Sequence, residues 1–195
     1  MLSENWAWKA EAWMPKNNWC VITGGPSTGK TTLLTELEKL GHNIVPEAAR
    51  TVIDEALSRG ISVENLRRDE KWFQEEVTRL KQKNEQSYNE SALTFFDRGM
   101  QDTIAFLRHY NFNIEKWVQD LMNTSRYQKV FLLQPLPTYE EDYARVEDEG
   151  FRNNIQSLLY DAYAESGMKP IIVHSASVKD RAEFILHHIK SEGTL

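Results

Sequence analysis

A glycine-rich segment at residues 24–31 constrains most strongly how this chain can fold. The segment reads Gly-Gly-Pro-Ser-Thr-Gly-Lys-Thr and fits the spacing G-x-x-x-x-G-K-[ST]. It follows an apolar strand pattern at residues 19–22 and precedes a helical pattern that includes Leu33, Leu34 and Leu37. Glycines at such a turn let backbone N–H groups surround phosphate oxygens, at the positive end of the helix dipole. The alternative is a glycine-rich turn with an accidental Lys-Thr pair, and the correct flanks on both sides argue against it.

The side chains of this segment predict a bound nucleoside triphosphate with Mg²⁺. Lys30 can place its charge on the β- and γ-phosphates, and the Thr31 hydroxyl suits a metal ligand. The guanine-reading string N-K-x-D is absent from the sequence, so adenine is the expected base, and ATP and Mg²⁺ are the expected cofactors. The expected nucleotide-binding residues are Gly25, Pro26, Ser27, Thr28, Gly29, Lys30, Thr31 and Thr32.

Short apolar segments alternate with helical patterns along the rest of the chain. This alternation is typical of βαβ units and predicts an α/β fold with a mainly parallel five-stranded sheet and helices on both faces. Ser62 is expected to cap one long, polar helix before the third strand. Ligands of such sheets bind outside the carboxyl ends of the strands. We expect the strands at residues 19–22, 43–45, 93–96, 130–133 and 171–173.

Charged residues follow the second and third strands. Asp97 ends an apolar run, where a carboxylate can hold a Mg²⁺-bound water, and Arg98 beside it can meet a phosphate. The alternative for Asp97 is an ordinary turn residue. Glu47 suits a base or a group that orients an attacking hydroxyl, although the helix dipole also favours an acid in a first helical turn. We expect Lys30, Glu47, Asp97 and Arg98 to be catalytic, with Thr31 and Asp97 at the metal.

A charged stretch at residues 138–152 follows the fourth strand and is long enough to close over a ligand. Arg145 and Arg152 lie in this stretch and are expected to be catalytic, stabilising charge on the transferring phosphoryl group under a closed lid. The alternative is a solvated loop in which these arginines pair with neighbouring acids.

These segments together resemble P-loop proteins of the NadR-type AAA domain group, which is related to nicotinamide riboside kinase domains and to nucleoside kinases. The resemblance covers most of the chain from Trp19 onward, including the lid arginines. It implies a P-loop NTPase fold, a three-layer sandwich with strand order 2-3-1-4-5. It also implies that Ala176, Ser177 and Val178 lie beside the adenine. No H-x-G-H signature is present, so adenylyl transfer is not expected. The resemblance rests on residues 23–32, 45–50, 95–103 and 177–181.

Composition excludes several classes of partner. The formal net charge of -6 and the pI near 5.5 leave no broad basic field for nucleic acid. No apolar stretch approaches the roughly 20 residues that span a bilayer, so integral membrane association is not expected. Cys20 is the single cysteine, which fits a reducing compartment and predicts a cytoplasmic protein.

Three functions remain open from the sequence. A small-molecule kinase would transfer the γ-phosphoryl group to an unidentified nucleoside- or riboside-like acceptor. A nucleotide-dependent switch, an ATPase or GTPase, would instead act on a protein or lipid partner, and a ring-forming AAA+ ATPase is the third reading. Residues 19–195 are expected to form the kinase-like domain. Residues 1–18 form an extension with three tryptophans, expected to pack on the domain or to serve a protein partner or homo-oligomer.

Overall fold

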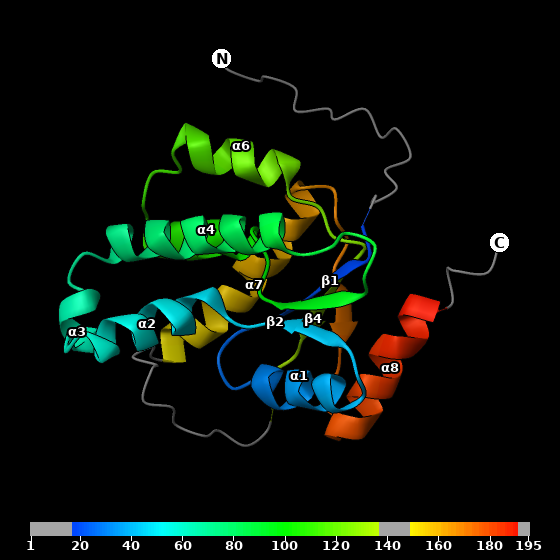
Figure 1. Ribbon diagram of the computed structural model, residues 1–195. Helices are drawn as coiled ribbons and strands as arrows, with labels where there is room; N and C mark the ends of the chain where they lie inside the picture. Colours follow the sequence, from blue (N-terminus) through cyan, green and yellow to red (C-terminus); the bar gives the residue numbers. More distant parts are fainter. Residues whose placement is uncertain (1–16, 137–148, 191–195) are drawn as a thin grey trace, which may run out of the picture.

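The computed structural model describes residues 17–136 and 149–190, with side chains described from residue 154 in the second stretch. A parallel sheet lies between two layers of helices (Figure 1). Within the described residues the sheet has five strands, and their order is β2-β3-β1-β4-β5. The expected fold class and strand order are therefore confirmed. The strands are β1 (Trp19–Thr23), β2 (Asn43–Val45), β3 (Thr94–Asp97), β4 (Lys129–Leu133) and β5 (Ile171–Val173).

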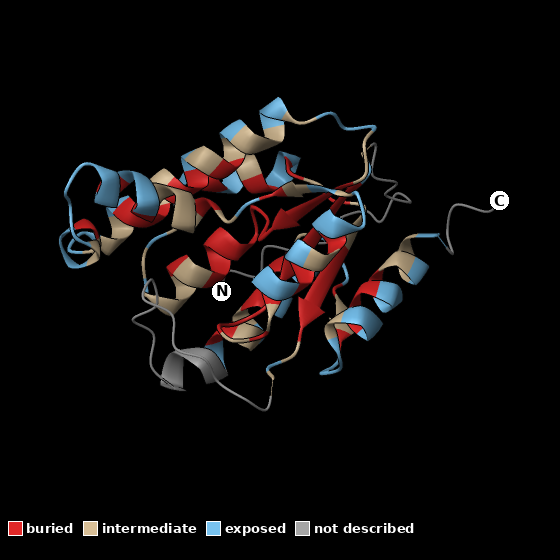
Figure 2. Cartoon of the chain, turned by 60° about the horizontal axis from the view of Figure 1, so that its bottom comes forward, coloured by how far each residue is buried: buried red, intermediate tan, exposed pale blue. Residues whose placement is uncertain are grey.

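The central strand β1 is buried because helices cover both faces of the sheet. Its side chains alternate between two apolar clusters, as the period of a strand requires. Cys20 and Ile22 pack with α1 (Lys30–Lys39) and α8 (Val178–Lys190). Trp19 and Val21 pack on the other face, with Tyr127 and Tyr163. Figure 2 shows buried strands between helices whose outer surfaces are exposed.

The second face of the sheet carries a larger group of helices. One apolar cluster joins α5 (Asp102–His109), α6 (Lys116–Thr124) and α7 (Glu149–Glu165) to the sheet. Another joins α2 (Ala48–Ser58) to α4 (Glu70–Ser87), which also contacts α5. The helix α4 therefore lies beside the carboxyl end of β3 and forms one wall of the candidate site.

The prediction of one long helix after Ser62 is wrong. The structure has two helices there, the short α3 (Val63–Leu66) and α4. Ser62 caps only α3, because its side chain accepts a hydrogen bond from the Asn65 amide. The carboxylate of Asp69 accepts a hydrogen bond from the Trp72 amide at 3.0 Å and begins a new helix. A second capping side chain therefore divides the segment.

Some expected features fall outside the described residues. These include Arg145 and the tryptophans of residues 1–16. Arg152 lies in the first turn of α7, so the last part of the expected lid is helical, but its side chain is not among those described. Among the helices of residues 17–136 and 149–190, none combines the length and the apolar character needed to cross a membrane.

Candidate active site

The phosphate-binding loop, residues 24–31, connects β1 to α1 with a backbone that depends on its glycines. Gly24 and Gly29 have φ values of 147° and 76°, and Ser27 also has a positive φ of 57°. A Cβ atom on Gly24 would lie 2.7 Å from the Leu133 carbonyl oxygen, and one on Gly29 would lie 2.9 Å from the Arg181 guanidinium. Both glycines therefore have conformations that side chains rarely adopt, and a Cβ would meet a backbone oxygen at Gly24 and displace the Arg181 side chain at Gly29.

Lys30 lies inside this loop. Its ammonium group donates hydrogen bonds to the carbonyl oxygens of Gly24 at 2.9 Å and Gly25 at 2.8 Å. The side chain is buried, so its charge is held at the centre of the loop. Thr31 and Thr32 follow in the first turn of α1 and are exposed. The structure thus brings together the loop residues that the sequence predicted.

Two side chains that the sequence analysis did not assign hold the loop from outside. Arg181 of α8 donates a hydrogen bond to the Thr28 carbonyl at 2.8 Å. Gln156 of α7 accepts a hydrogen bond from the Gly25 amide at 3.0 Å and donates one to the Leu133 carbonyl at 2.9 Å. The loop is therefore fixed by two helices distant in sequence. No local pattern reveals either contact, because each depends on how a helix packs across the sheet.

The residues expected near adenine lie in the connection between β5 and α8. Ala176 and Ser177 are exposed and Val178 is partly buried. The Ser177 hydroxyl donates to the Asp180 carboxylate at 2.6 Å and accepts from the Asp180 amide, so it caps α8. Since Arg181 follows in the first turn of α8, this connection is tied to the phosphate-binding loop.

Arg98 links the end of β3 to the phosphate-binding loop. It is buried, has a φ of 69° and forms an ion pair with Glu47, at 2.8 Å between Nε and Oε1. Its Nη1 atom donates to the Gly24 carbonyl and to Asp102 Oδ1, each at 3.1 Å. The predicted residues Glu47 and Arg98 are therefore in contact. Arg98 therefore joins Glu47 to the phosphate-binding loop.

Asp102 is a buried carboxylate of the candidate site that the sequence analysis did not assign. It is fully buried and accepts hydrogen bonds from the Thr23 hydroxyl, the Gly99 amide and the Tyr163 hydroxyl, as well as from Arg98. Four donors on one carboxylate fix the geometry of the β3–α5 connection. Asp102 stands four residues after Arg98, and this spacing was the available signal.

Asp97 ends β3 at the edge of the sheet where the phosphate-binding loop begins. Its Oδ1 atom is buried and has no hydrogen-bond partner among the described residues. Burial and the nearby Glu47 charge raise the pKa of Asp97 to about 7, although Lys30 and Arg98 oppose the shift. Buried carboxylate oxygens are normally bonded, so an oxygen without a partner at this position suits a cation or a substrate hydroxyl.

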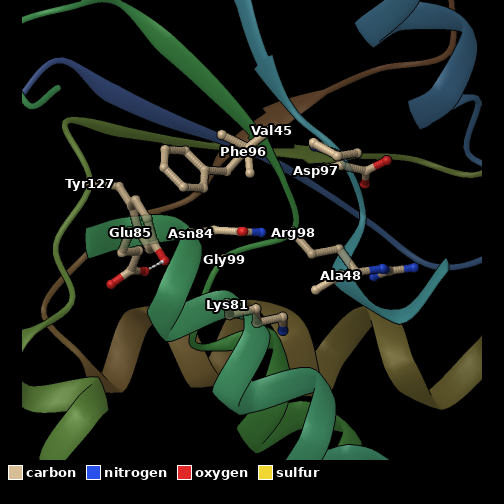
Figure 3. Close-up of a pocket in the computed structure, with 11 residues that line it drawn as sticks. Val45, Ala48, Lys81, Asn84, Glu85, Phe96, Asp97, Arg98, Gly99 and Tyr127 are labelled. Atoms are coloured by element: carbon tan, nitrogen blue, oxygen red, sulfur yellow. Dashed lines mark hydrogen bonds between the residues drawn. The ribbon is translucent and has the colours of Figure 1, made fainter. Parts of the chain in front are cut away.

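A narrow pocket, here called the α4–β3 pocket, opens beside Asp97 and Arg98. Figure 3 shows Lys81 and Glu85 reaching from α4, with Asp97 and Arg98 at the end of β3. The Tyr127 hydroxyl donates a hydrogen bond to Glu85 at one side. The lining residues are Val45, Pro46, Ala48, Lys81, Asn84, Glu85, Phe96, Asp97, Arg98, Gly99 and Tyr127.

Known proteins share this architecture. The family described as AAA domain matches residues 19–181, and no curated protein sequence matches the chain. The solved deoxyadenosine kinase from M. mycoides, with dCMP and dCDP bound, has a TM-score of 0.61 at 16% identity, and the match covers 89% of this chain and 98% of that one. NadR in complex with NR has a TM-score of 0.67 at 19% identity, covering 89% of this chain and 51% of that one.

Thymidylate kinase from Candida albicans also has this fold, with a TM-score of 0.64 at 12% identity over 90% of this chain and 92% of that one. At such identities the structural matches show a common fold, and this chain spans about half the length of NadR. The AAA domain match shows the family as well as the fold, because it runs from β1 through the phosphate-binding loop and β3 to Arg181. The chain therefore belongs to the AAA domain family of P-loop proteins.

Proposed function

We propose that this chain is an ATP-dependent kinase that transfers the γ-phosphoryl group to a hydroxyl of a nucleoside- or riboside-like small molecule. The bridge formed by Arg98 is the observation that carries this proposal. One guanidinium group of this pocket-lining residue bonds to Gly24 in the phosphate-binding loop and to Glu47, which stands between the lining residues Pro46 and Ala48. The pocket and the loop are thereby held as one site, as transfer between two bound molecules requires.

The chain's own residues fit ATP with Mg²⁺. The Asp97 oxygen without a partner is a ligand that a cation would satisfy. Thr31 and Asp97 would hold Mg²⁺, which neutralises charge on the phosphates when bound. The exposed connection at Ala176, Ser177 and Val178 is the proposed adenine site, because Arg181 ties it to the Thr28 carbonyl.

In the transfer, the acceptor oxygen bonds to the γ-phosphorus while the bond to the bridging oxygen breaks and ADP leaves. Lys30 exchanges its carbonyl contacts in the loop for phosphate oxygens. Glu47, oriented by Arg98 at 2.8 Å, takes the hydroxyl proton. Arg145 and Arg152 are proposed to cover the phosphates.

Acceptor-dependent release of ADP tests the proposal. Purified protein with Mg²⁺ and ATP is assayed with nucleosides and ribosides, and turnover is expected with at least one of them. Glu47→Gln should lower kcat by about 100-fold or more, the range of a lost general base. Glu55→Gln, an exposed change on the same helix α2, should leave kcat unchanged. ATP binding without turnover for any acceptor would instead favour the nucleotide-dependent switch.

A further inference from the structure

A buried lysine lies in the wall of the α4–β3 pocket. Lys81 is 7% exposed, and Figure 3 shows its side chain between α4 and the residues at the end of β3. Among the described residues its ammonium group has one hydrogen-bond partner, the Thr103 hydroxyl oxygen at 3.3 Å. An ammonium group has three donors, so Lys81 retains the capacity to donate to a further oxygen.

Burial of this charge disfavours the folded state. Desolvation lowers the pKa of Lys81 to about 8, against the opposing influence of Asp102. The side chain is therefore still mostly protonated at neutral pH. A charge that is buried with one weak partner costs stability, and packing alone would be served better by an apolar side chain.

The carboxylates around Lys81 are engaged elsewhere. Glu47 and Asp102 both bond to Arg98. Glu85 accepts from the hydroxyl groups of Tyr127 and Ser125. Within the part of the chain that the structure describes, Lys81 lines the pocket and forms no ion pair, so its unused donors are not committed to a fixed anion.

The charge of the site decides which oxygen suits these donors. Four carboxylates, Glu47, Glu85, Asp97 and Asp102, outnumber the three cations among them, Lys30, Lys81 and Arg98. A phosphate group on the acceptor would meet repulsion from this excess of carboxylates. A neutral carbonyl oxygen would accept from Lys81 without adding charge.

We infer that Lys81 is a specificity-determining residue, which donates a hydrogen bond to a carbonyl oxygen of an acceptor that carries no phosphate. The inference rests on the proposed kinase function and names the acceptor class. The reacting hydroxyl lies with Glu47 and Arg98, which join the phosphate-binding loop. Lys81 lines the pocket from α4, and we assign the carbonyl that meets it to another part of the acceptor, the base of a riboside.

Matched acceptors test this assignment. ADP release is measured with two pairs that differ in one ring carbonyl, inosine against purine riboside and uridine against zebularine, and with the 5′-monophosphates of inosine and uridine. In at least one pair, the wild-type protein should favour the member with the additional carbonyl by about 10- to 100-fold in kcat/KM, the range of a hydrogen bond to a charged group. The monophosphates should be poorer acceptors than the nucleosides.

Lys81→Met should abolish this preference by raising KM for the favoured member, with little change for its counterpart. Lys83→Met, an exposed change on the same helix, should keep the preference. Binding of a fluorescent ATP analogue, measured in parallel, should be the same in both variants and shows that they are folded.

Several outcomes would overturn the inference alone. In each of them the wild-type protein binds ATP. It then uses both members of each pair equally, or turns over neither pair. Alternatively, the preference survives Lys81→Met, or the monophosphates are the better acceptors. Failure of the wild-type protein to bind ATP would overturn the proposed function, and this inference with it.

Discussion

Replacing Lys81 by methionine should stabilise the protein although it removes acceptor preference. Methionine has a similar length and no charge, so it can fill the wall of the α4–β3 pocket. The pKa of Lys81 is lowered from 10.5 to about 8, mainly by burial. A pKa difference of one unit between the folded and unfolded states corresponds to about 1.4 kcal/mol. Carrying this charge therefore costs the folded state about 3 kcal/mol at neutral pH.

The lowered pKa of Lys81 determines how the free energy of unfolding changes with pH. Between pH 8 and 10.5 the unfolded chain holds the Lys81 proton and the folded chain does not, so rising pH stabilises the wild-type protein. Below pH 8 both states hold the proton and the wild-type protein bears the full cost. The stability gap between Lys81→Met and wild type should therefore narrow by about 2 kcal/mol between about pH 7.5 and 9.5. The charged groups that act on Lys81 in the fold are Asp102, Arg98, Glu47 and Glu85.

Urea unfolding followed by tryptophan fluorescence measures this gap. Lys83→Met removes a lysine from an exposed position of the same helix and should change the free energy of unfolding by less than about 0.5 kcal/mol at either pH. A Lys81→Met variant that is less stable than wild type at pH 7.5, or a gap that does not change with pH, would refute the idea of a costly charge held in the pocket.

The remaining predictions concern the loop and the β3–α5 connection. Gly29→Ala should lower the free energy of unfolding by about 1 to 3 kcal/mol and weaken ATP binding, because its Cβ would lie 2.9 Å from a guanidinium. Gly41 also has a positive φ but has open space around it. Urea unfolding should therefore show a smaller loss of stability for Gly41→Ala than for Gly29→Ala. Asp102→Asn should destabilise the fold by about 3 to 5 kcal/mol in the same measurement, because it leaves Arg98 with less compensating charge. Asp97→Asn should fold normally but bind ATP equally with and without Mg²⁺ by calorimetry, and a retained Mg²⁺ dependence would contradict the metal assignment.

The features that a local pattern encodes could be predicted from the sequence. The spacing of residues 24–31 and the apolar runs beside it predict the phosphate-binding loop, and β1 and α1 confirm those flanks. Asp97 could be placed near the loop because parallel strands end at the same edge of a sheet. The register of β1 and β3, which sets Ile22 opposite Asp97, bears this out.

The contacts that fix the site could not be predicted, because they join residues far apart in the chain. Gln156 and Arg181 reach the loop from α7 and α8, and Tyr163 reaches Asp102 across 61 positions. The division between α3 and α4 was missed for another reason. Asp69 competes locally with the helix, and its capping role is visible only when its carboxylate is seen to accept from the Trp72 amide.

Binding of ATP in the presence of Mg²⁺, measured by isothermal titration calorimetry, tests the central claim most directly. Wild-type protein should bind ATP at one site per chain. Lys30→Ala should weaken binding by about 100-fold, since it removes a charge-assisted contact with the phosphates. Lys39→Ala, at the exposed end of the same helix, should bind like wild type. No measurable binding to the wild-type protein, or equal affinity for Lys30→Ala, would contradict the account.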